Sequence, residues 1–545
     1  MNKIKCFRII SACVSLIFLL SAFAWPKATS ATADRATWLV NSLADDDDGS
    51  CAAPDDCTLR EAINLSNSGD IINFESALAG GTINLTSTLI IDNNLTIENS
   101  DLKNKVTLNG QGTDNIMDVN YGISLTVKRL TFLDGFSTGG AINSNHGLVT
   151  IDLCNFTSNG SSNATGGALY NNLGTMTITR AYFSGNEAQK GGAIYNYGHL
   201  IISDSFFENN SAVWRGGAIF NSLGSITDMN LEINNSTFSG NTTDTYEGGA
   251  INNESHGPLE VTNSTFEGNS ATADGGGIYS YTDTDTKITH STFSGNSAGA
   301  ATDGGGIHIL GSLRMYNSIL SNSVTGYDCY WNYIDLPTSI NNLIMNNAPS
   351  TTACGTPLLT NNPNLGALVN NGGFTQTMAL PETSPAVDQG HVTYCETEDQ
   401  RGVVRPSGPG CDLGAYEYEY PDTTPPVVSS IVTTDPNPTY ATQVHYTVTF
   451  SEPVTGVTIS DFNLRATGLS GHSLGTVSGS GAVYTVTANT GSGIGTLRLD
   501  VIDDDTILDL ASLPLGGVGE HNGNFDSGEK YMVRYYGTFL PFISR

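Results

Sequence analysis

Short stretches in which apolar and polar residues alternate recur through the middle of the chain. Two of them are Leu231-Glu-Ile233-Asn and Leu259-Glu-Val261-Thr, and each precedes a phenylalanine. A period of two residues is typical of β-strands. No stretch within this region has the 3.6-residue period of an amphipathic helix, so the pattern predicts many short strands.

Two interleaved motifs repeat along this region. Gly-Gly-(Ala/Gly)-(Ile/Leu) starts at Gly139, Gly166, Gly191, Gly216, Gly248, Gly275 and Gly304. The other is Ser-x-Phe-x-x-Asn or a close variant, with its apolar residue at Phe132, Phe156, Phe183, Phe207, Phe238, Phe266, Phe293 and Leu320. A mean spacing near 27 residues indicates a solenoid, because a propeller blade needs about 40–45 residues. The repeats therefore predict a parallel β-helix with one coil per repeat.

Stacked coils place equivalent residues in ladders about 4.8 Å apart. We expect the phenylalanines to form an inward column and the asparagines three residues later to form an amide ladder. That ladder comprises Asn159, Asn186, Asn210, Asn241, Asn269 and Asn296. The Gly pair suits a corner where the backbone takes φ > 0. Cys154 occupies a position held in other repeats by Ala or Ser, which favours a buried core thiol over a reactive one.

Composition and charge exclude several classes of protein. Charged residues make up only 14% of the 545 residues, and the net charge is −31. Helical bundles and coiled coils are excluded, since they are rich in Ala, Leu, Glu, Lys and Arg. The acidity argues against nucleic acid as a partner, because phosphate binding needs clustered Lys and Arg. The acidity also argues against docking to anionic lipid.

The N-terminus has the pattern of an export signal. Lys3, Lys5 and Arg8 precede an apolar run, and small-x-small cleavage patterns end at Ala24 and Ala33. We expect residues 1–33 to be a Sec-type bacterial signal peptide. No later stretch is long and apolar enough to span a bilayer. The mature protein is then expected to be secreted, extracellular or at the cell surface, with no transmembrane segment.

Cysteine use agrees with an oxidising compartment. Beyond the signal, six of seven cysteines fall into close sequence pairs. We predict disulfide bonds between Cys51 and Cys57, Cys329 and Cys354, and Cys395 and Cys411.

The chain divides into segments of different pattern. A cap at 34–80 contains Thr58 and Glu61, which predict a capping box at a helix start. The β-helix is expected over 81–380, with its end at 381–419 and a Pro-rich linker at 420–426, and residues 38–380 would give about 13 coils. Longer alternating strands with Gly/Ser-rich turns predict an antiparallel β-sandwich over 427–535. The tail at 536–545 is either a last strand or an export or anchoring signal.

Several of these motifs resemble known families. The Gly-Gly-Ala-Ile and Phe-x-x-Asn repeats resemble those of chlamydial-type polymorphic outer-membrane proteins and related right-handed β-helix proteins. Cys57-Thr58-Leu-Arg-Glu-Ala62 resembles the CSLREA motif found before such helices, with Thr58 in place of its serine. Asp399-Gln-Arg-Gly402 and Cys411-Asp-Leu-Gly-Ala-Tyr-Glu417 resemble the choice-of-anchor Q segment of bacterial secreted proteins, and Phe450-Ser-Glu-Pro-Val-Thr-Gly-Val457 resembles bacterial Ig-like domains. The resemblance implies a right-handed parallel β-helix of the pectin lyase-like kind, followed by an Ig-like sandwich, at the surface or outside the cell and without assigned chemistry.

Two acidic runs are candidate calcium sites. One is Asp45, Asp46, Asp47 and Asp48, and the other contains Asp500, Asp503 and Asp505. Calcium takes several oxygen ligands, and a bound cation would relieve the self-repulsion of so acidic a protein. The alternatives are a solvated acidic loop for the first run and an ordinary turn for the second.

A row of aromatic residues is the candidate ligand site. The residue after each Gly-Gly-Ala-Ile motif should point outward, because side chains alternate along a strand. Tyr170, Tyr195 and Phe220 then lie on consecutive coils, and Tyr279 lies farther along the same row. A stripe of exposed rings marks a binding surface for sugars or proteins. The alternative is that the rings only stack on one another and stabilise the sheet.

The sequence contains no local catalytic cluster. Glycoside hydrolysis needs two carboxylates across a cleft, and the repeats have few basic residues for a lyase reaction. We therefore expect a non-catalytic adhesion or interaction scaffold whose partners are extracellular glycans or surface proteins. The alternative is a β-helix enzyme that degrades polysaccharides, as a lyase or a glycoside hydrolase.

Overall fold

The computed structural model describes residues 35–51, 57–100, 104–222, 230–281 and 285–534. The chain divides into two units, Met1–Tyr418 and Glu419–Arg545, and each is considered by itself. The expected signal peptide at 1–33 and the expected tail at 536–545 lie outside the described residues.

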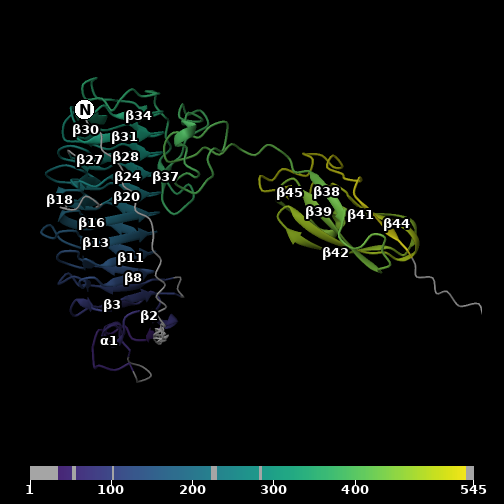
Figure 1. Cartoon of the computed structure of the whole chain (residues 1–545), viewed down its shortest axis with the longest axis horizontal. Helices are drawn as coiled ribbons and strands as arrows, with labels where there is room; N and C mark the ends of the chain where they lie inside the picture. The colour runs from purple at the N-terminus through teal and green to yellow at the C-terminus, as the bar shows by residue number, and fades with distance from the viewer. Residues whose placement is uncertain (1–34, 52–56, 101–103, 223–229, 282–284, 535–545) are drawn as a thin grey trace, which may run out of the picture. The chain divides into compact units, whose positions relative to one another are not determined.

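The first unit is a parallel β-helix, as the repeats predict (Figure 1). Its largest sheet, called here the long sheet, has 20 strands. These strands are β1 (Thr37–Val40), β2 (Ile71–Phe74), β4 (Leu89–Ile91), β5 (Leu95–Glu98), β7 (Met117–Val119), β8 (Ser124–Lys128), β10 (Ile142–Asn145), β11 (Leu148–Asp152), β13 (Leu169–Thr179), β16 (Ile194–Ser203), β19 (Ile219–Asn221), β20 (Leu231–Asn234), β23 (Ile251–Asn253), β24 (Leu259–Thr262), β27 (Ile278–Ser280), β28 (Asp285–Thr289), β30 (Gly304–Ile309), β31 (Ser312–Tyr316), β33 (Tyr327–Trp331) and β34 (Thr338–Ile340).

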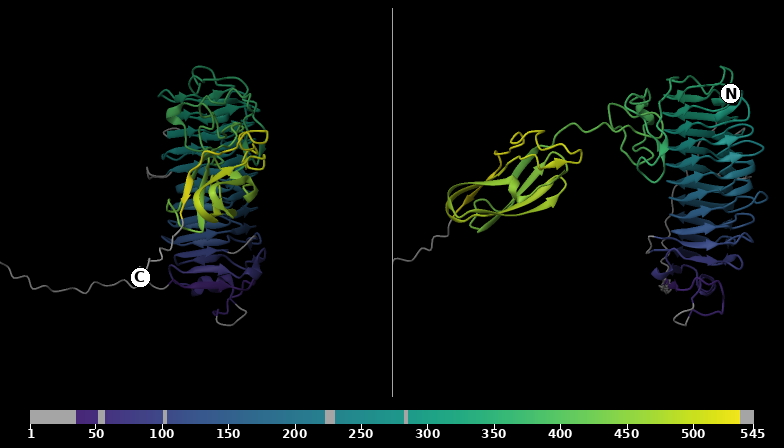
Figure 2. Two further views of the ribbon diagram at one scale, coloured as in Figure 1. Left: turned by 90° about the vertical axis from the view of Figure 1, so that its right-hand side faces the viewer. Right: turned by 180° about the vertical axis from the view of Figure 1, so that it is seen from behind.

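Two further parallel sheets complete the coils, whose stacking is visible from other sides in Figure 2. The phenylalanine sheet consists of β3 (Thr82–Asn84), β6 (Val106–Asn109), β9 (Leu130–Leu133), β12 (Asn155–Thr157), β14 (Tyr182–Ser184), β17 (Phe206–Glu208), β21 (Thr237–Ser239), β25 (Thr265–Glu267), β29 (Thr292–Ser294), β32 (Ile319–Ser321) and β35 (Leu343–Ile344). The short sheet consists of β15 (Glu187–Lys190), β18 (Ser211–Arg215), β22 (Thr242–Thr243) and β26 (Ser270–Ala271).

The Gly pairs form the corner between the short sheet and the long sheet. Gly216 has φ +66°, and a Cβ there would lie 2.2 Å from the carbonyl oxygen of Ile219. A Cβ on Gly217 would lie 2.1 Å from the carbonyl oxygen of Gly249 in the next coil. The motif is therefore required both by the backbone conformation and by the close approach of neighbouring coils.

The phenylalanines form the predicted inward column. From Phe132 to Phe293, successive rings are stacked with centroids 4.5–4.9 Å apart and interplanar angles of 2–6°. The predicted asparagine ladder lies three residues farther along each coil, with Nδ2 donating to Oδ1 of the next coil at 2.8–3.0 Å. All of these side chains are buried, so the repeated residues form the interior of the helix.

A row of serine hydroxyls explains the position of Cys154. Each hydroxyl accepts a hydrogen bond from the backbone N–H of the equivalent residue in the preceding coil, as Ser236 does from Ser205 at 3.1 Å. Cys154 occupies this row, and its Sγ lies 3.4 Å from the carbonyl oxygen of Asp152. Burial raises the pKa of the Cys154 thiol to about 11. The thiol is therefore a buried core group, as its place in the repeat predicts.

The N-terminal end of the helix is covered by α1 (Leu59–Leu65). Thr58 is its N-cap and forms the predicted capping box with Glu61. Burial acts to raise the pKa of Glu61, but hydrogen bonds from Thr58 and Asp48 outweigh it and hold that pKa below its ordinary value. A short 3₁₀ helix, η1 (Ser76–Leu78), follows β2.

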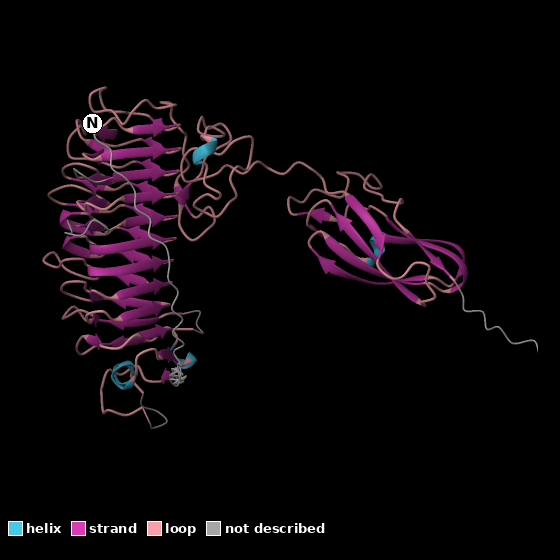
Figure 3. Ribbon diagram, in the orientation of Figure 1, coloured by secondary structure: helices cyan, strands magenta, loops and turns pink. Residues whose placement is uncertain are grey.

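The described phenylalanine sheet has 11 strands, so the expected 13 coils are too many. The reason is that the stack ends with β35, after which the chain folds back beside the phenylalanine sheet (Figure 3). We call residues 360–418 the flap. It contains β36 (Leu368–Val369), β37 (Thr377–Met378) and η2 (Val392–Tyr394).

The flap is attached by buried polar contacts to one row of threonines. Gln400 donates from Nε2 to Thr237 Oγ1 at 2.8 Å and accepts at Oε1 from Thr265 Oγ1 at 2.6 Å. The Ala415 N–H donates to Thr292 Oγ1 at 2.9 Å. These threonines lie on β21, β25 and β29, so the flap contacts the same position of three neighbouring coils.

The interior of the flap contains buried ion pairs. Arg405 Nη1 lies 2.7 Å from Glu417 Oε2, and Arg401 Nη2 lies 2.8 Å from Asp399 Oδ2. Breaking such a pair leaves an uncompensated buried charge, at a cost of about 3–5 kcal/mol. The interior of the flap is thus formed by the stretches 399–402 and 411–417, which carry the Asp-Gln-Arg-Gly and Cys-Asp-Leu-Gly-Ala-Tyr-Glu motifs.

The structure holds the three disulfide bonds expected from the sequence. They join Cys51 to Cys57, Cys329 to Cys354 and Cys395 to Cys411. Cys154 is the free cysteine among the described residues.

The second unit has antiparallel sheets on either side of one core, which agrees with the predicted β-sandwich. One sheet is β38 (Val428–Thr433), β39 (Gln443–Phe450), β43 (Val483–Asn489) and β42 (Ser473–Ser480), and the other is β41 (Phe462–Ser470), β44 (Ser492–Val501) and β46 (Lys530–Val533). A third pairing joins β40 (Val454–Thr455) to β45 (Leu508–Asp509), and η3 (Ile459–Asp461) precedes β41. Tyr446 and Tyr531, from different sheets, meet edge to face with centroids 5.1 Å apart.

Among the described helices of the whole chain, none has the length and apolar character needed to cross a membrane.

Candidate ligand-binding face

The residues that follow the Gly-Gly motifs form one row across the outer face of the long sheet. We call Asn143, Tyr170, Tyr195, Phe220, Asn252, Tyr279 and His308 the aromatic row, and parallel pairing places each beside the next. The residue after each one points inward, and Asn171, Asn196, Asn221 and Asn253 form a second buried amide ladder at 2.7 Å. The predicted alternation along these strands is therefore confirmed.

The aromatic row is less exposed than predicted. Tyr170 and Tyr195 are half-buried, whereas Phe220 is 1% exposed and Tyr279 is 6% exposed. The prediction that these rings are exposed is wrong for Phe220 and Tyr279. Tyr170 and Tyr195 stack with centroids 5.2 Å apart, and Lys190 Nζ lies 5.0 Å from the centroid of the Phe220 ring. Rings and neighbouring side chains cover one another, which supports a structural contribution of the row to the sheet.

Two exposed aromatic side chains lie beside this row and were not singled out from the sequence. Trp214 is 38% exposed and Tyr246 is 44% exposed. They lie on neighbouring coils, because the Tyr246 N–H donates to the Trp214 carbonyl oxygen at 3.1 Å. Both stand two residues before a Gly pair, and this shared position is the signal that could have identified them.

A cation lies over each of these two rings. Lys190 Nζ is 5.7 Å from the centroid of the Trp214 ring, and Arg215 Cζ is 5.3 Å from that of Tyr246. Such cation–π contacts contribute roughly 0.5–1 kcal/mol at exposed sites and hold the rings in one orientation. The structure thus presents two oriented, exposed rings at the corner of adjacent coils.

Charged residues line the same corner at the position directly before the last five Gly pairs. We call Lys190, Arg215, Glu247, Asp274 and Asp303 the corner row. Arg215 links two carboxylates, with Nε 2.9 Å from Glu247 Oε2 and Nη1 2.6 Å from Glu254 Oε1. Burial raises the pKa of Glu254, although Arg215 and Lys190 act in the opposite direction.

The far end of the corner row holds two adjacent carboxyl groups. Asp274 Oδ1 lies 3.2 Å from His308 Nδ1. Burial and the neighbouring Asp274 carboxylate raise the pKa of Asp303. Carboxyl groups in direct contact do not match glycoside hydrolysis, in which they flank the scissile bond about 5 Å or more apart. This end of the row therefore supplies hydrogen-bonding groups rather than a hydrolytic pair.

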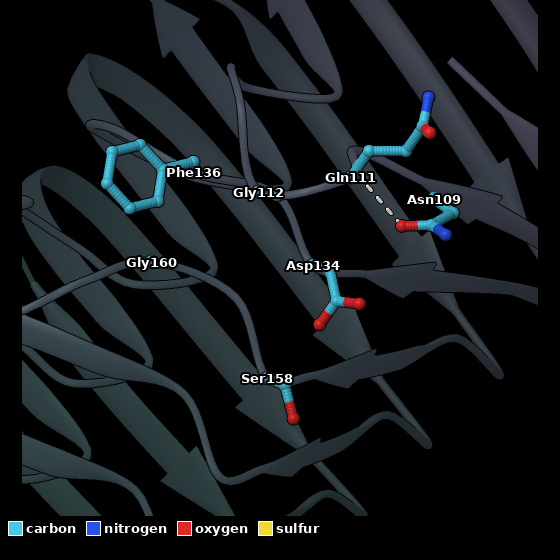
Figure 4. A pocket seen from close by; sticks show the side chains of 8 residues that line it. Asn109, Gln111, Gly112, Asp134, Phe136, Ser158 and Gly160 are labelled. Carbon is cyan, nitrogen blue, oxygen red and sulfur yellow. Dashed lines mark hydrogen bonds between the residues drawn. The ribbon is translucent and has the colours of Figure 1, made fainter.

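A separate polar hollow of about 480 Å³ lies at another corner of the first coils (Figure 4). Its lining includes Asn109, Gln111, Asp134, Phe136 and Ser158. Asn109 Oδ1 accepts a hydrogen bond from the Gln111 N–H at 2.9 Å. The hollow offers one carboxylate and one exposed ring, without the paired rings and cations of the corner row.

The first predicted calcium run is engaged in contacts around α1. Asp45 forms a two-point ion pair with Arg60, at 3.0 and 2.8 Å, and also accepts hydrogen bonds from Thr86. Asp47 accepts from the Asn64 amide at 2.7 Å, and Asp48 accepts from the Ser50 N–H at 2.9 Å. Asp46 contributes its carbonyl oxygen, which accepts from the Thr58 hydroxyl.

The second predicted run is likewise paired with protein groups. Asp500 pairs with Arg498 at 2.6 Å, Asp503 accepts from the Gly523 N–H at 3.0 Å, and Asp505 accepts from the Gly519 N–H at 3.0 Å. In the part of the chain that the structure describes, neither run brings three donor groups within 4.8 Å of one another. Calcium binding at these two runs stays a prediction, because the described residues do not bring a set of ligands together there.

Comparisons with known proteins agree with the repeat architecture. The Chlamydia polymorphic membrane protein repeat matches residues 180–197, 204–222, 235–254 and 263–281. No curated protein matches the sequence. A solved structure titled pectate lyase Pel9A is similar, with 12% identity, a TM-score of 0.39, and coverage of 71% of this chain and 98% of that one. The first unit is therefore a parallel β-helix, and four of its segments between residues 180 and 281 are similar to the Chlamydia polymorphic membrane protein repeat.

Proposed function

We propose that this is an exported surface protein whose β-helix is a non-catalytic adhesion scaffold, and that Trp214 and Tyr246 with the corner row bind extracellular glycans. The observation that carries the proposal is the pair of exposed rings on neighbouring coils, each backed by a cation. The polymorphic membrane protein repeats and the three disulfides support a place outside the cytoplasm.

The chemistry of this face suits a hydroxyl-rich ligand. The flat apolar faces of sugar rings stack on aromatic side chains, and the tryptophan and tyrosine supply such surfaces in fixed orientation. Arg215 and Glu254 lie beside them and offer donors and acceptors for hydroxyl groups. The net charge of −31 favours neutral or cationic glycans over polyanionic ones.

The test is a glycan array probed with the full chain, followed by calorimetric titration of the best ligand. The double variant Trp214→Ala/Tyr246→Ala should bind at least about tenfold more weakly, because both stacking surfaces are lost. Tyr121→Ala removes an exposed ring elsewhere on the helix and serves as the matched control. Equal affinity of the double variant and the wild type, or an array without any ligand, would refute the glycan proposal.

The enzymatic alternative is tested separately. The protein is incubated with pectin, alginate and mixed glycans, with and without Ca²⁺, and assayed for new reducing ends and unsaturated products. We expect none. Product formation that a single Asp→Asn substitution abolishes would replace the scaffold by a polysaccharide-degrading enzyme.

A further inference from the structure

Three carboxylates meet in the second unit, at positions that neither acidic run includes. Asp422 lies in the segment before β38, Glu452 lies between β39 and β40, and Asp509 is the last residue of β45. One oxygen of each lies within 4.8 Å of the other two. The fold brings them together because Asp509 pairs with Val454 across β40 and β45, two residues beyond Glu452.

Asp509 is the buried member of this cluster. The residue is 4% exposed, and its Oδ1 accepts a hydrogen bond from the Leu513 N–H at 2.8 Å. Its Oδ2 is buried and has no hydrogen-bond partner among the described residues. A buried carboxylate oxygen without a hydrogen-bond partner is unfavourable when the group is ionised, so this oxygen is expected to face a cation.

The described residues supply no cation at this place. Among the described residues, no Lys, Arg or His forms an ion pair with these three carboxylates, whereas Arg498 and Arg465 neutralise Asp500 nearby in the sequence. Burial, followed by the charges of Asp422 and Asp509, raises the pKa of Glu452.

We infer that Asp422, Glu452 and Asp509 form a Ca²⁺-binding site. The donors are all oxygens, which suit a hard cation, and the cluster contains no Cys or His for zinc or copper. Calcium takes six to eight oxygens in flexible geometry, so carbonyl groups and water complete the shell around three carboxylates. Magnesium demands near-ideal octahedral geometry and fits such a set less well. Binding ties the segment that contains Asp422 to the sandwich.

The test uses the full chain, with calorimetric titration of Ca²⁺ and scanning calorimetry in EDTA or in Ca²⁺. Glu452→Gln and Asp509→Asn should each lower the Ca²⁺ affinity at least about tenfold, because each removes a charged ligand. Glu520→Gln makes the same change of charge at an exposed residue of the same unit and should leave the affinity unchanged. Mg²⁺ at the same concentration should give a smaller shift of the melting temperature.

The order of the melting temperatures separates a metal site from a merely structural cluster. In EDTA, Asp509→Asn should melt at or above the wild-type temperature, since it removes an unpaired buried charge. In Ca²⁺ the order should reverse, because the wild type alone gains stability from the ion. Wild-type melting that Ca²⁺ does not change, or Ca²⁺ binding that is lost in Asp503→Asn but retained in Asp509→Asn, would overturn the inference.

Discussion

The side-chain amide of Asn186 donates to Oδ1 of Asn210 at 2.8 Å, and both side chains are fully buried. The backbone N–H of Asn186 donates to the same oxygen at 3.1 Å, and Asn186 Nδ2 also reaches the Phe156 carbonyl oxygen at 3.0 Å. One side chain thus links its coil to both neighbouring coils. The ladder is the polar counterpart of the phenylalanine column.

Replacement of one ladder residue should destabilise the first unit. Asn210→Ala leaves the buried Asn186 N–H without its acceptor and the Phe183 carbonyl without its side-chain donor, whereas Asn241 Oδ1 keeps the backbone N–H of residue 210. We expect a loss of about 3 kcal/mol or more, since each buried group left unpaired costs about 1–3 kcal/mol. Thermal unfolding, with hydrogen exchange of the flanking amides, measures it. Asn145→Ala, at an exposed position, should change stability by no more than about 0.5 kcal/mol, and equal losses in the two variants would contradict the prediction.

The Cys154 thiol should be unreactive in the folded protein. Its pKa is raised to about 11 by burial, so the thiolate that reacts is rare at pH 8, and solvent does not reach it. Iodoacetamide followed by peptide mass mapping should find Cys154 unmodified in native protein and modified in guanidinium chloride. Rapid modification without denaturant would show that this coil opens.

The aromatic row and the exposed rings should respond differently to substitution. Phe220→Ala should lower stability by about 3 kcal/mol, because it empties a buried site between Tyr195 and Lys190. Trp214→Ala should change stability by less than about 1 kcal/mol and should instead weaken ligand binding. Thermal unfolding and glycan titration of both variants separate the two roles. A stable Phe220→Ala variant that no longer binds the glycan would indicate that the aromatic row is the binding site.

The flap should make stability depend on pH. Burial, with a smaller contribution from Glu417, raises the pKa of Asp412 to about 7, despite hydrogen bonds from the Tyr418 and Asp388 amides. The folded state then holds a proton that the unfolded state releases near pH 4. This contribution to stability is full below pH 4 and is lost as the pH rises to about 7.

Asp412→Asn should remove this dependence. The variant cannot titrate, so its melting temperature should fall less than that of the wild type between pH 5 and pH 8. The amide also loses an acceptor, which lowers stability equally at every pH. Melting curves at four pH values distinguish the two effects, and parallel wild-type and variant curves would contradict the assignment of the proton to Asp412.

Periodic features were predictable because parallel stacking repeats one environment in every coil. Phe183 and Asn186 have the same neighbours as Phe207 and Asn210, one coil apart, so a residue type that suits one coil suits all. The same reasoning placed Cys154 correctly in the core. Exposure was not predictable in this way: Tyr195 and Phe220 are equivalent in the repeat, yet one is half-buried and the other is covered.

The sequence by itself determined the coil, its inward column and ladders, the corner glycines, the disulfide pairs and the change to antiparallel strands in the second unit. The disulfide pairs follow from closeness in the sequence, and the other features depend on local alternation or on a regular spacing. Only the tertiary structure decided that the flap covers the row of threonines, that Lys190 lies over Phe220, and that Asp422, Glu452 and Asp509 meet. These contacts join segments whose separation follows no period, so their partners are set by how the whole chain packs.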